Sequence, residues 1–453
     1  MNRRLAVTFH DFARNRFQGH WAPFRMAWAA LCLAAGIIAV TLPPLLAAGI
    51  AGAAVLFVLG WTRPAWLPIL IIGLSPLTWS LTGENSPIRF GISELCLGAF
   101  AMASFPRSLL NRRALSAGPL NLPIFLFLGW SLVTAVHHWY PQTALVLVQM
   151  ALYLWVVPVL FADLRGGALT IWRGLKLLAV MDLCIGIGVL ALFLMGERQG
   201  VFLFGLHKNS VGSSLAAGLI LFITMSCEDH NRKRIYAFGA LMIGAALFAT
   251  LSRGAWLGAA AGLGILISIK GYDRRLSLLA AAIFLLCLWM FLLLPERSFN
   301  YLTFGQGPHQ NLTIRMDTYR EGWLAFTSSP IFGQGPGIGK ESSGFNSLYL
   351  MILAESGLPG LILFGWLIIS TFKMYRAAHR IAGTDSVERR LIAIAAAVTV
   401  CYWVHAAIDL YWGRGIMLQW ACIGAVIGIW QKHSSTAIIG DDTASGLNVR
   451  AKP

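Results

Sequence analysis

The feature that most constrains this chain is a series of long, continuous apolar runs separated by short polar connections. Hydrophobic residues make up 57% of the 453 residues and charged residues only 12%, and the mean hydropathy is +0.69. A polytopic membrane protein has this composition, and its backbone polar groups must pair inside the hydrocarbon. Because the runs are continuous rather than alternating, they predict helices rather than a β-barrel. The predicted runs are 27–42, 45–61, 65–81, 91–105, 119–136, 143–161, 176–195, 211–226, 236–252, 255–269, 277–294, 346–372, 391–407 and 415–431.

The charges predict how the chain crosses the membrane. The formal net charge is +16, and connections rich in Lys and Arg alternate with connections that are poor in them. By the positive-inside rule, this alternation places both ends of the chain in the cytoplasm and predicts about 12–14 transmembrane helices. The predicted parts are a basic cytoplasmic N-terminus (1–25), transmembrane helices (26–294), a large periplasmic loop over the active site (295–345), further transmembrane helices (346–431) and a cytoplasmic tail (432–453).

Other function classes find little support in the sequence. The basic charge lies in short connections rather than on a recognisable nucleic-acid-binding module, so we expect no nucleic-acid partner. The seven cysteines are scattered without a CxxC pair or a histidine at ligand spacing, so neither a disulfide framework nor a zinc site is predicted. We expect no metal and no cofactor.

Several cations lie on the side of the membrane that the positive-inside rule predicts to be poor in them. A group of arginines is a natural receptor for phosphate, because each guanidinium pairs with two oxygens at once. Inside a membrane protein, this predicts a lipid phosphate or diphosphate as the ligand; pairing with nearby carboxylates or exposure to water is the alternative. These cations are Arg89, Arg198, Lys208, Arg253, Arg297, Arg315, Arg320, Lys340 and Arg414.

Three stretches add polar groups on the same predicted side. Residues 197–212 (ERQGVFLFGLHKNSVG) combine cations with glycines that allow close backbone approach. Residues 331–339 (IFGQGPGIG) have four alternating glycines. They predict a loop whose N–H groups cradle an anion; the alternative is a flexible lid or a tight turn back to the membrane. Asn346 and Ser347 suit a helix start, and Glu355 stands inside the apolar run that follows.

The order of these motifs resembles the superfamily of O-antigen ligases and Wzy-type polymerases. The motifs are GLHKNSVG (205–212), Ser252-Arg253-Gly254, R-x4-R-x2-W (315–323), SPIFGQGPG (329–337) and NSLYLMILAESGLPG (346–360), and the resemblance covers roughly residues 195–375. It implies a membrane glycosyltransferase with a GT-C-like helical bundle in the bacterial inner membrane and an active site facing the periplasm. The implied donor is a glycan linked to undecaprenyl diphosphate, and the implied acceptor is lipid A-core for a ligase or a second carrier-linked repeat for a polymerase.

The resemblance also implies roles for individual residues. Arg198 and Arg253 resemble the arginines that hold the donor diphosphate. The family often has His-Asn where this chain has Asn346-Ser347, and asparagine cannot act as a general base near neutral pH. His309, Asp317, Glu341 and Glu355 are the open substitutes for that base. The predicted catalytic residues are Arg198, Arg253, Asn346 and Glu355, and the predicted substrate-binding residues are His207, Lys208, Asn209, Arg315, Arg320, His309 and Tyr349.

Three classes of function fit the sequence to different degrees. Transfer of a carrier-linked oligosaccharide explains the outside arginines, since a diphosphate leaving group develops negative charge. The two acceptors, lipid A-core and a second repeat, are nearly even, and the His-Lys-Asn stretch slightly favours a polymerase. A transporter or flippase for lipid-linked or anionic glycans shares the bundle but predicts charge deep in the membrane rather than at one face. A structural scaffold leaves the arginines unexplained.

Overall fold

A computed structural model describes residues 44–77, 91–110, 115–164, 167–196, 206–229, 231–270, 274–292, 309–341, 345–383, 387–409 and 416–446. Only the backbone is described for residues 44–51, 270, 274–277, 309–312, 314, 340–341 and 435–446. The chain divides into two compact units, 1–63 and 64–453. In the first unit, the described helix is α3 (Pro44–Thr62), which begins at the second proline of a Pro-Pro pair.

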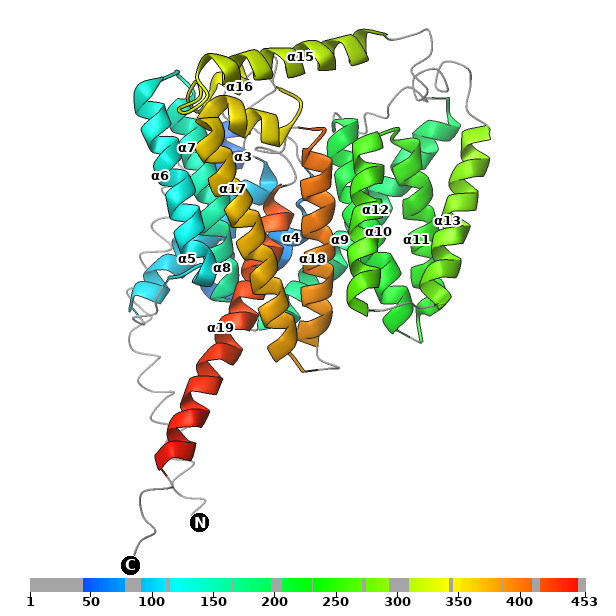
Figure 1. The fold of residues 1–453 in the computed structure, drawn as a ribbon. Helices are drawn as coiled ribbons and strands as arrows, with labels where there is room; N and C mark the ends of the chain where they lie inside the picture. The colour runs from blue at the N-terminus through cyan, green and yellow to red at the C-terminus, as the bar shows by residue number, and fades with distance from the viewer. Residues whose placement is uncertain are drawn as a thin grey trace, which may run out of the picture. The chain divides into compact units, whose positions relative to one another are not determined.

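The described part of the second unit is helical, and Figure 1 colours its helices from blue to red in chain order. They are α4 (Trp66–Gly73), α5 (Ile92–Leu110), η1 (Gly118–Leu120), α6 (Asn121–His137), α7 (Thr143–Ala151), η2 (Leu152–Val156), α8 (Val157–Ala162), α9 (Gly167–Leu194), α10 (Lys208–Glu228), α11 (Lys233–Ala249), α12 (Arg253–Lys270), α13 (Arg274–Leu292), α15 (His309–Ser328), α16 (Ile338–Glu341), α17 (Leu348–Ile381), α18 (Val387–Ala406) and α19 (Ile416–Gly446).

The prediction of an all-α, multi-pass membrane protein is confirmed. Five described segments are long and apolar enough to cross a membrane: Gly118–His137, Thr143–Ala162, Gly167–Leu194, Lys208–Glu228 and Leu348–Ile381. Shorter apolar helices lie at Gly52–Thr62, Arg253–Ile269 and Leu278–Leu292. The total of 12–14 spans stays a prediction, as do the domain boundaries.

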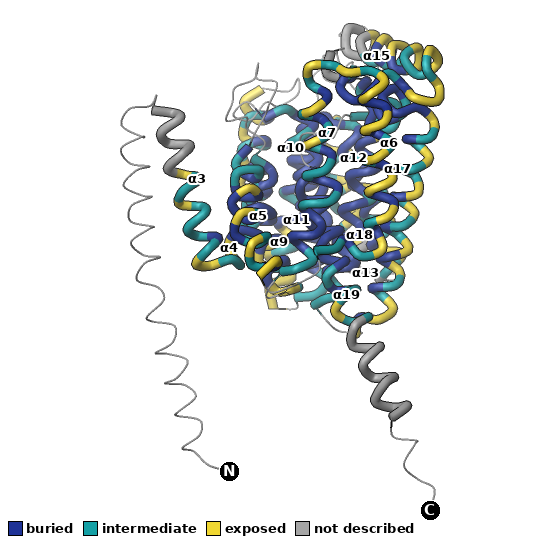
Figure 2. Tube along the Cα trace, turned by 90° about the vertical axis from the view of Figure 1, so that its left-hand side faces the viewer, coloured by how far each residue is buried: buried dark blue, intermediate teal, exposed yellow. Residues whose placement is uncertain are grey.

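Helix α10 lies at the centre of the second unit and packs against α9, α11, α12, α13 and α18. Nearly all of its side chains are buried, including Ser213, Ser214 and Thr224. Its small residues allow close approach: a Cβ at Gly212 would lie 3.0 Å from Ala255 Cβ, and one at Gly218 would lie 2.6 Å from Asp182 Oδ2. In membranes, small residues let helices pack tightly without a hydrophobic driving force. The burial colours of Figure 2 show this inner position of α10 against the exposed positions along α15.

The structure differs from the sequence prediction at three segments. The stretch 295–345, predicted as a loop, contains α15 and α16. Helix α9 begins at Gly167, so the predicted connection around Lys176 is helical, and Lys176 Nζ lies 5.8 Å from the centroid of the Trp172 ring. Helix α19 continues to Gly446, beyond the predicted end at residue 431. There, Lys432 and His433 are bonded to Glu388 of α18, which stabilises the extension.

Helix α17 has a sharp interruption that positions the turn before it. Gly357 has φ 64° and ψ −169°, a conformation that only glycine adopts readily. The freed backbone groups find partners: Leu358 N–H donates to Pro330 O at 2.9 Å, and Trp130 Nε1 donates to Ser356 O at 2.7 Å. The turn at 329–337 is therefore fixed to the interrupted helix and to α6.

Candidate functional site

The first turn of α10 carries the predicted motif of residues 207–212. His207 has extended backbone angles (φ −66°, ψ 138°), and its Nδ1 accepts the N–H of Asn209 at 3.3 Å, so it is the N-cap. Capping by a side chain satisfies an N–H group that has no partner within the helix. Lys208 and Asn209 follow directly and are each 8% exposed. Two polar side chains are therefore held inside the bundle at the positive end of a helix.

The start of α12 meets the start of α10. Ser252 Oγ donates a hydrogen bond to Asn209 Oδ1 at 3.0 Å, and both side chains are buried. Leu251 has φ 54°, which is unusual for a residue with a side chain, and it precedes the Ser-Arg-Gly motif directly. This tight turn places Arg253 at the first position of α12, beside Ser252. The two motifs, far apart in sequence, thus form one polar cluster.

The end of α18 packs against the same turn. A Cβ at Gly254 would lie 2.5 Å from His405 Cδ2, so only glycine allows this approach. His405 is 1% exposed, and its Nε2 lies 3.8 Å from Asp409 Oδ2. Neither His405 nor Asp409 is among the site residues that the sequence predicts. The signal that could have found them is an ionisable side chain at the end of an apolar run. Such a side chain is costly to place in a membrane, so it is a candidate for a functional site.

Helix α15 brings one predicted arginine to this cluster and leaves the other outside. Arg315 is half-buried, its Nη1 donates to Ile408 O at 3.0 Å, and its charge acts on His405. Thr318 and Gly322 share its inner face and are buried. Asp317 and Arg320 lie on the outer face and are exposed. The structure therefore brings together Arg253 and Arg315 near one end of α18, and it does not bring Arg320 to them.

Asn346 joins α17 to α15 next to this cluster. It has φ 49°, and its Nδ2 donates to Thr318 Oγ1 at 2.8 Å, one helical turn from Arg315. Ser347 is the N-cap of α17, as the sequence predicts, and accepts the N–H of Leu350 at 3.4 Å. Tyr349 Oη donates to Trp403 O of α18 at 3.0 Å, so its hydroxyl fixes α17 to α18. The predicted roles of Asn346 and Tyr349 toward substrate stay predictions.

The glycine-rich turn is a structural element, and its N–H groups are used within the protein. Gly333 N–H donates to Ser329 O at 2.8 Å, Gly335 N–H to Glu355 O at 3.0 Å and Gly337 N–H to Glu355 Oε1 at 3.0 Å. The prediction that this stretch cradles an anion is wrong for these three groups, because each already has an acceptor. The stretch forms a tight turn between α15 and α16, in agreement with the turn alternative. Glu355 itself is 4% exposed.

An apolar cavity opens beside the start of α12. Its volume is about 430 Å³, and its walls come from α10, α11, α12 and α13. Trp256, one turn after Arg253, lines it and stacks on Phe248 with ring centroids 5.1 Å apart and an interplanar angle of 5°. Ala260, Leu263 and Phe284 line it farther along. An apolar cavity next to a cationic cluster matches a ligand that has a charged head and a hydrocarbon chain.

Some predicted residues lie outside what the structure describes. Arg198 is outside the described residues, as are Arg89, Arg297 and Arg414. The side chains of His309, Lys340 and Glu341 are also not described. Within the described part of the chain, no group of three or more His, Cys, Asp or Glu side chains is arranged to hold a metal ion.

Comparison with known proteins finds a family match over some of the segments that build this cluster, namely those of α12, α15 and the start of α17. Residues 237–365 match the family described as O-Antigen ligase. The match includes Arg253, Arg315, Asn346 and Glu355 and ends inside α17. No curated protein matches the chain. Residues 237–365 are therefore similar to the O-antigen ligase family, which supports the resemblance that the order of the motifs predicts.

Proposed function

We propose that the protein is an inner-membrane glycosyltransferase that moves an oligosaccharide from undecaprenyl diphosphate to an acceptor hydroxyl at the periplasmic face. The observation that carries this proposal is the convergence of Arg253 and Arg315 near the end of α18, with the apolar cavity beside α12. The arginines are suited to the diphosphate, and the cavity is suited to the first part of the polyprenyl chain. Arg198 is proposed to add a further contact with the diphosphate.

In the proposed reaction, the acceptor hydroxyl oxygen attacks the anomeric carbon of the donor sugar. The bond from that carbon to the diphosphate oxygen breaks, and the lipid diphosphate leaves with the bonding electrons. Arg253 and Arg315 lower the barrier because they bind the leaving group more strongly as its charge develops. Lys208, at the positive end of α10, adds to the same field.

The proton of the acceptor hydroxyl needs an acceptor of its own. The Asn346 side chain, held by Thr318, can orient a hydroxyl but cannot take its proton. Glu355 Oε1 already accepts the N–H of Gly337, so we assign Glu355 to positioning of the glycine-rich turn. We propose that a diphosphate oxygen of the leaving group takes the proton, which requires no protein base.

Ligase and polymerase differ in the acceptor, and reconstitution decides between them. The purified protein is supplied with an undecaprenyl-diphosphate-linked oligosaccharide and, in separate reactions, with lipid A-core or with a second carrier-linked repeat. Product on lipid A-core alone identifies a ligase, and a ladder of repeats identifies a polymerase. Movement of the donor across proteoliposomes with no change in glycan linkage would instead support a transporter and contradict the proposal.

A further inference from the structure

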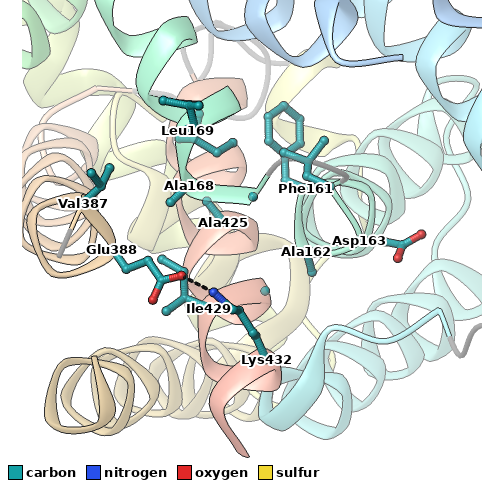
Figure 3. Close-up of a pocket in the computed structure, with 14 residues that line it drawn as sticks. Phe161, Ala162, Asp163, Ala168, Leu169, Val387, Glu388, Ala425, Ile429 and Lys432 are labelled. Carbon is teal, nitrogen blue, oxygen red and sulfur yellow. Dashed lines mark hydrogen bonds and ion pairs between the residues drawn. The ribbon is translucent and has the colours of Figure 1, made fainter. Parts of the chain in front are cut away.

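A second cavity lies at the other end of α18 from the arginine cluster. Its volume is about 720 Å³, within the range of about 300–1,000 Å³ typical of small-molecule sites. Its apolar wall includes Phe161, Leu169, Val387 and Ile429, which come from α8, α9, α18 and α19 (Figure 3). Leu169 is 51% exposed, so this wall reaches the outer surface of the helices. The cavity is therefore open on an apolar side.

One ion pair forms the polar edge of this cavity. Glu388 Oε1 lies 2.9 Å from Lys432 Nζ, and the pair lines the cavity together (Figure 3). The other carboxylate oxygen, Oε2, lies 2.7 Å from His433 Nε2. The third charged residue at the cavity, Asp163, points away from this pair and accepts a hydrogen bond from Ser108 Oγ at 2.8 Å (Figure 3). The edge thus offers one cation and one anion side by side.

We propose that this cavity binds a phospholipid whose head group carries both a phosphate and a primary ammonium, as phosphatidylethanolamine does. Lys432 Nζ contacts the phosphate, Glu388 accepts hydrogen bonds from the ammonium, and the apolar wall holds the glycerol end of the acyl chains. The Lys432 side chain is 67% exposed, and exposed ion pairs contribute little free energy, so Lys432 can exchange its partner readily. His433 stays on the second oxygen and keeps the Glu388 carboxylate in place.

The charge arrangement favours this head group over other common ones. A trimethylammonium group, as in phosphatidylcholine, has no N–H to donate to Glu388. A glycerol head group, as in phosphatidylglycerol, has no cation to face the carboxylate. We therefore expect a preference for the ethanolamine lipid of about fivefold, which is what one solvent-accessible, charge-assisted hydrogen bond provides. This inference is independent of the proposed glycan transfer.

Native mass spectrometry of the full-length protein in detergent tests the proposal. Phosphatidylethanolamine, phosphatidylcholine and phosphatidylglycerol with identical acyl chains are added singly at equal concentration. We expect Glu388→Gln to abolish the preference for the ethanolamine lipid and Lys432→Gln to weaken binding of all three. Arg390→Gln is the matched control, because Arg390 lies at the same end of α18, pairs with Glu228 at 3.5 Å and does not line the cavity.

A second variant keeps both charges and tests whether the cavity itself is needed for lipid binding. Ala168→Trp fills the cavity from its α9 side, and we expect it to lower ethanolamine-lipid binding at least fivefold with an unchanged elution profile. A preference that persists in Glu388→Gln overturns the proposal. So does equal binding of glycerophosphoethanolamine, which has the head group without acyl chains, because the site would then recognise a soluble phosphate ester.

Discussion

Asn346 Nδ2 donates a hydrogen bond to Thr318 Oγ1 at 2.8 Å, and this contact joins the start of α17 to the inner face of α15. Thr318 Oγ1 in turn donates to Arg315 O at 2.9 Å, so the asparagine and the arginine are connected through one buried hydroxyl. Two residues that the sequence assigns to substrate thus belong to one framework. The contact gives the Asn346 side chain a structural role that needs no proton transfer, because its amide holds Thr318 in place.

We expect Asn346→Ala to lower kcat about tenfold, because the substrate hydroxyl and α15 both lose a hydrogen bond that orients them. Asn346→His adds a group with an ordinary pKa of about 6.5, and we expect its rate to rise between pH 5.5 and 7.5 where the natural protein shows no such rise. Transfer rates across this range, measured for both variants, check the prediction. A natural protein with the same rise would mean that a protein base already operates.

Arg253 is the first residue of α12 and directly follows Ser252, which is hydrogen-bonded to Asn209. Removing it should lower kcat/KM at least about 100-fold, since a charge-assisted hydrogen bond to phosphate contributes about 1.5–3 kcal/mol and Arg253 can form two. Transfer from the lipid-linked donor is compared in Arg253→Ala and Arg376→Ala. Arg376 is an exposed cation toward the other end of α17, and its loss should leave transfer unchanged. Similar losses in both variants would contradict a specific role for Arg253.

The hydrogen bond from Gly337 N–H to Glu355 Oε1 allows a test of whether Glu355 positions the turn or acts as a catalytic acid or base. If Glu355 positions the turn, Glu355→Gln keeps an oxygen that accepts the Gly337 N–H, and transfer should stay within about threefold of the natural rate. Glu355→Ala leaves that N–H unsatisfied and should lower both the melting temperature and the rate. A loss of 100-fold or more in Glu355→Gln with normal stability would instead identify a catalytic acid or base.

Filling the apolar cavity beside α12 tests whether it holds the donor chain. Ala260 lines the cavity, so Ala260→Trp should raise KM about tenfold for the undecaprenyl donor. It should have a smaller effect on a donor with a shorter prenyl chain. Leu257→Trp is the control, because Leu257 is 57% exposed on the same helix and does not line the cavity. If both substitutions had equal effects on both donors, the prenyl chain of the donor would not bind in this cavity.

Gly357 should be intolerant of any side chain. A Cβ there would lie 2.2 Å from Ile331 O, and φ is 64°. We expect Gly357→Ala to lower the free energy of unfolding by about 1–3 kcal/mol, the usual cost of such backbone strain. Gly365→Ala on the same helix is the control, since a Cβ at Gly365 meets nothing within 4 Å. Melting temperatures of the two variants in one detergent check the prediction.

The sequence by itself determined the class of fold and most helix positions. In a continuous apolar run, the backbone lies in hydrocarbon and must form its hydrogen bonds within the run, which a helix does. This requirement applies to each run separately, so it can be read from the local sequence. The order of the motifs from Gly205 to Gly360 also predicted the resemblance to O-antigen ligases, and the family match over residues 237–365 supports it. Such motifs are local in the sequence, so their order can be read without the structure.

Only the tertiary structure decided which polar residues meet. Arg315 and Arg320 lie five positions apart on α15. Arg315 lies on the inner face and bonds to Ile408 O, whereas Arg320 lies on the outer face and is exposed. The N–H groups of Gly335 and Gly337 both find acceptors on Glu355, which α17 presents just before its interruption at Gly357. His405 reaches the cluster because Gly254 has no side chain. Contacts between distant segments depend on helix packing, which no local pattern specifies.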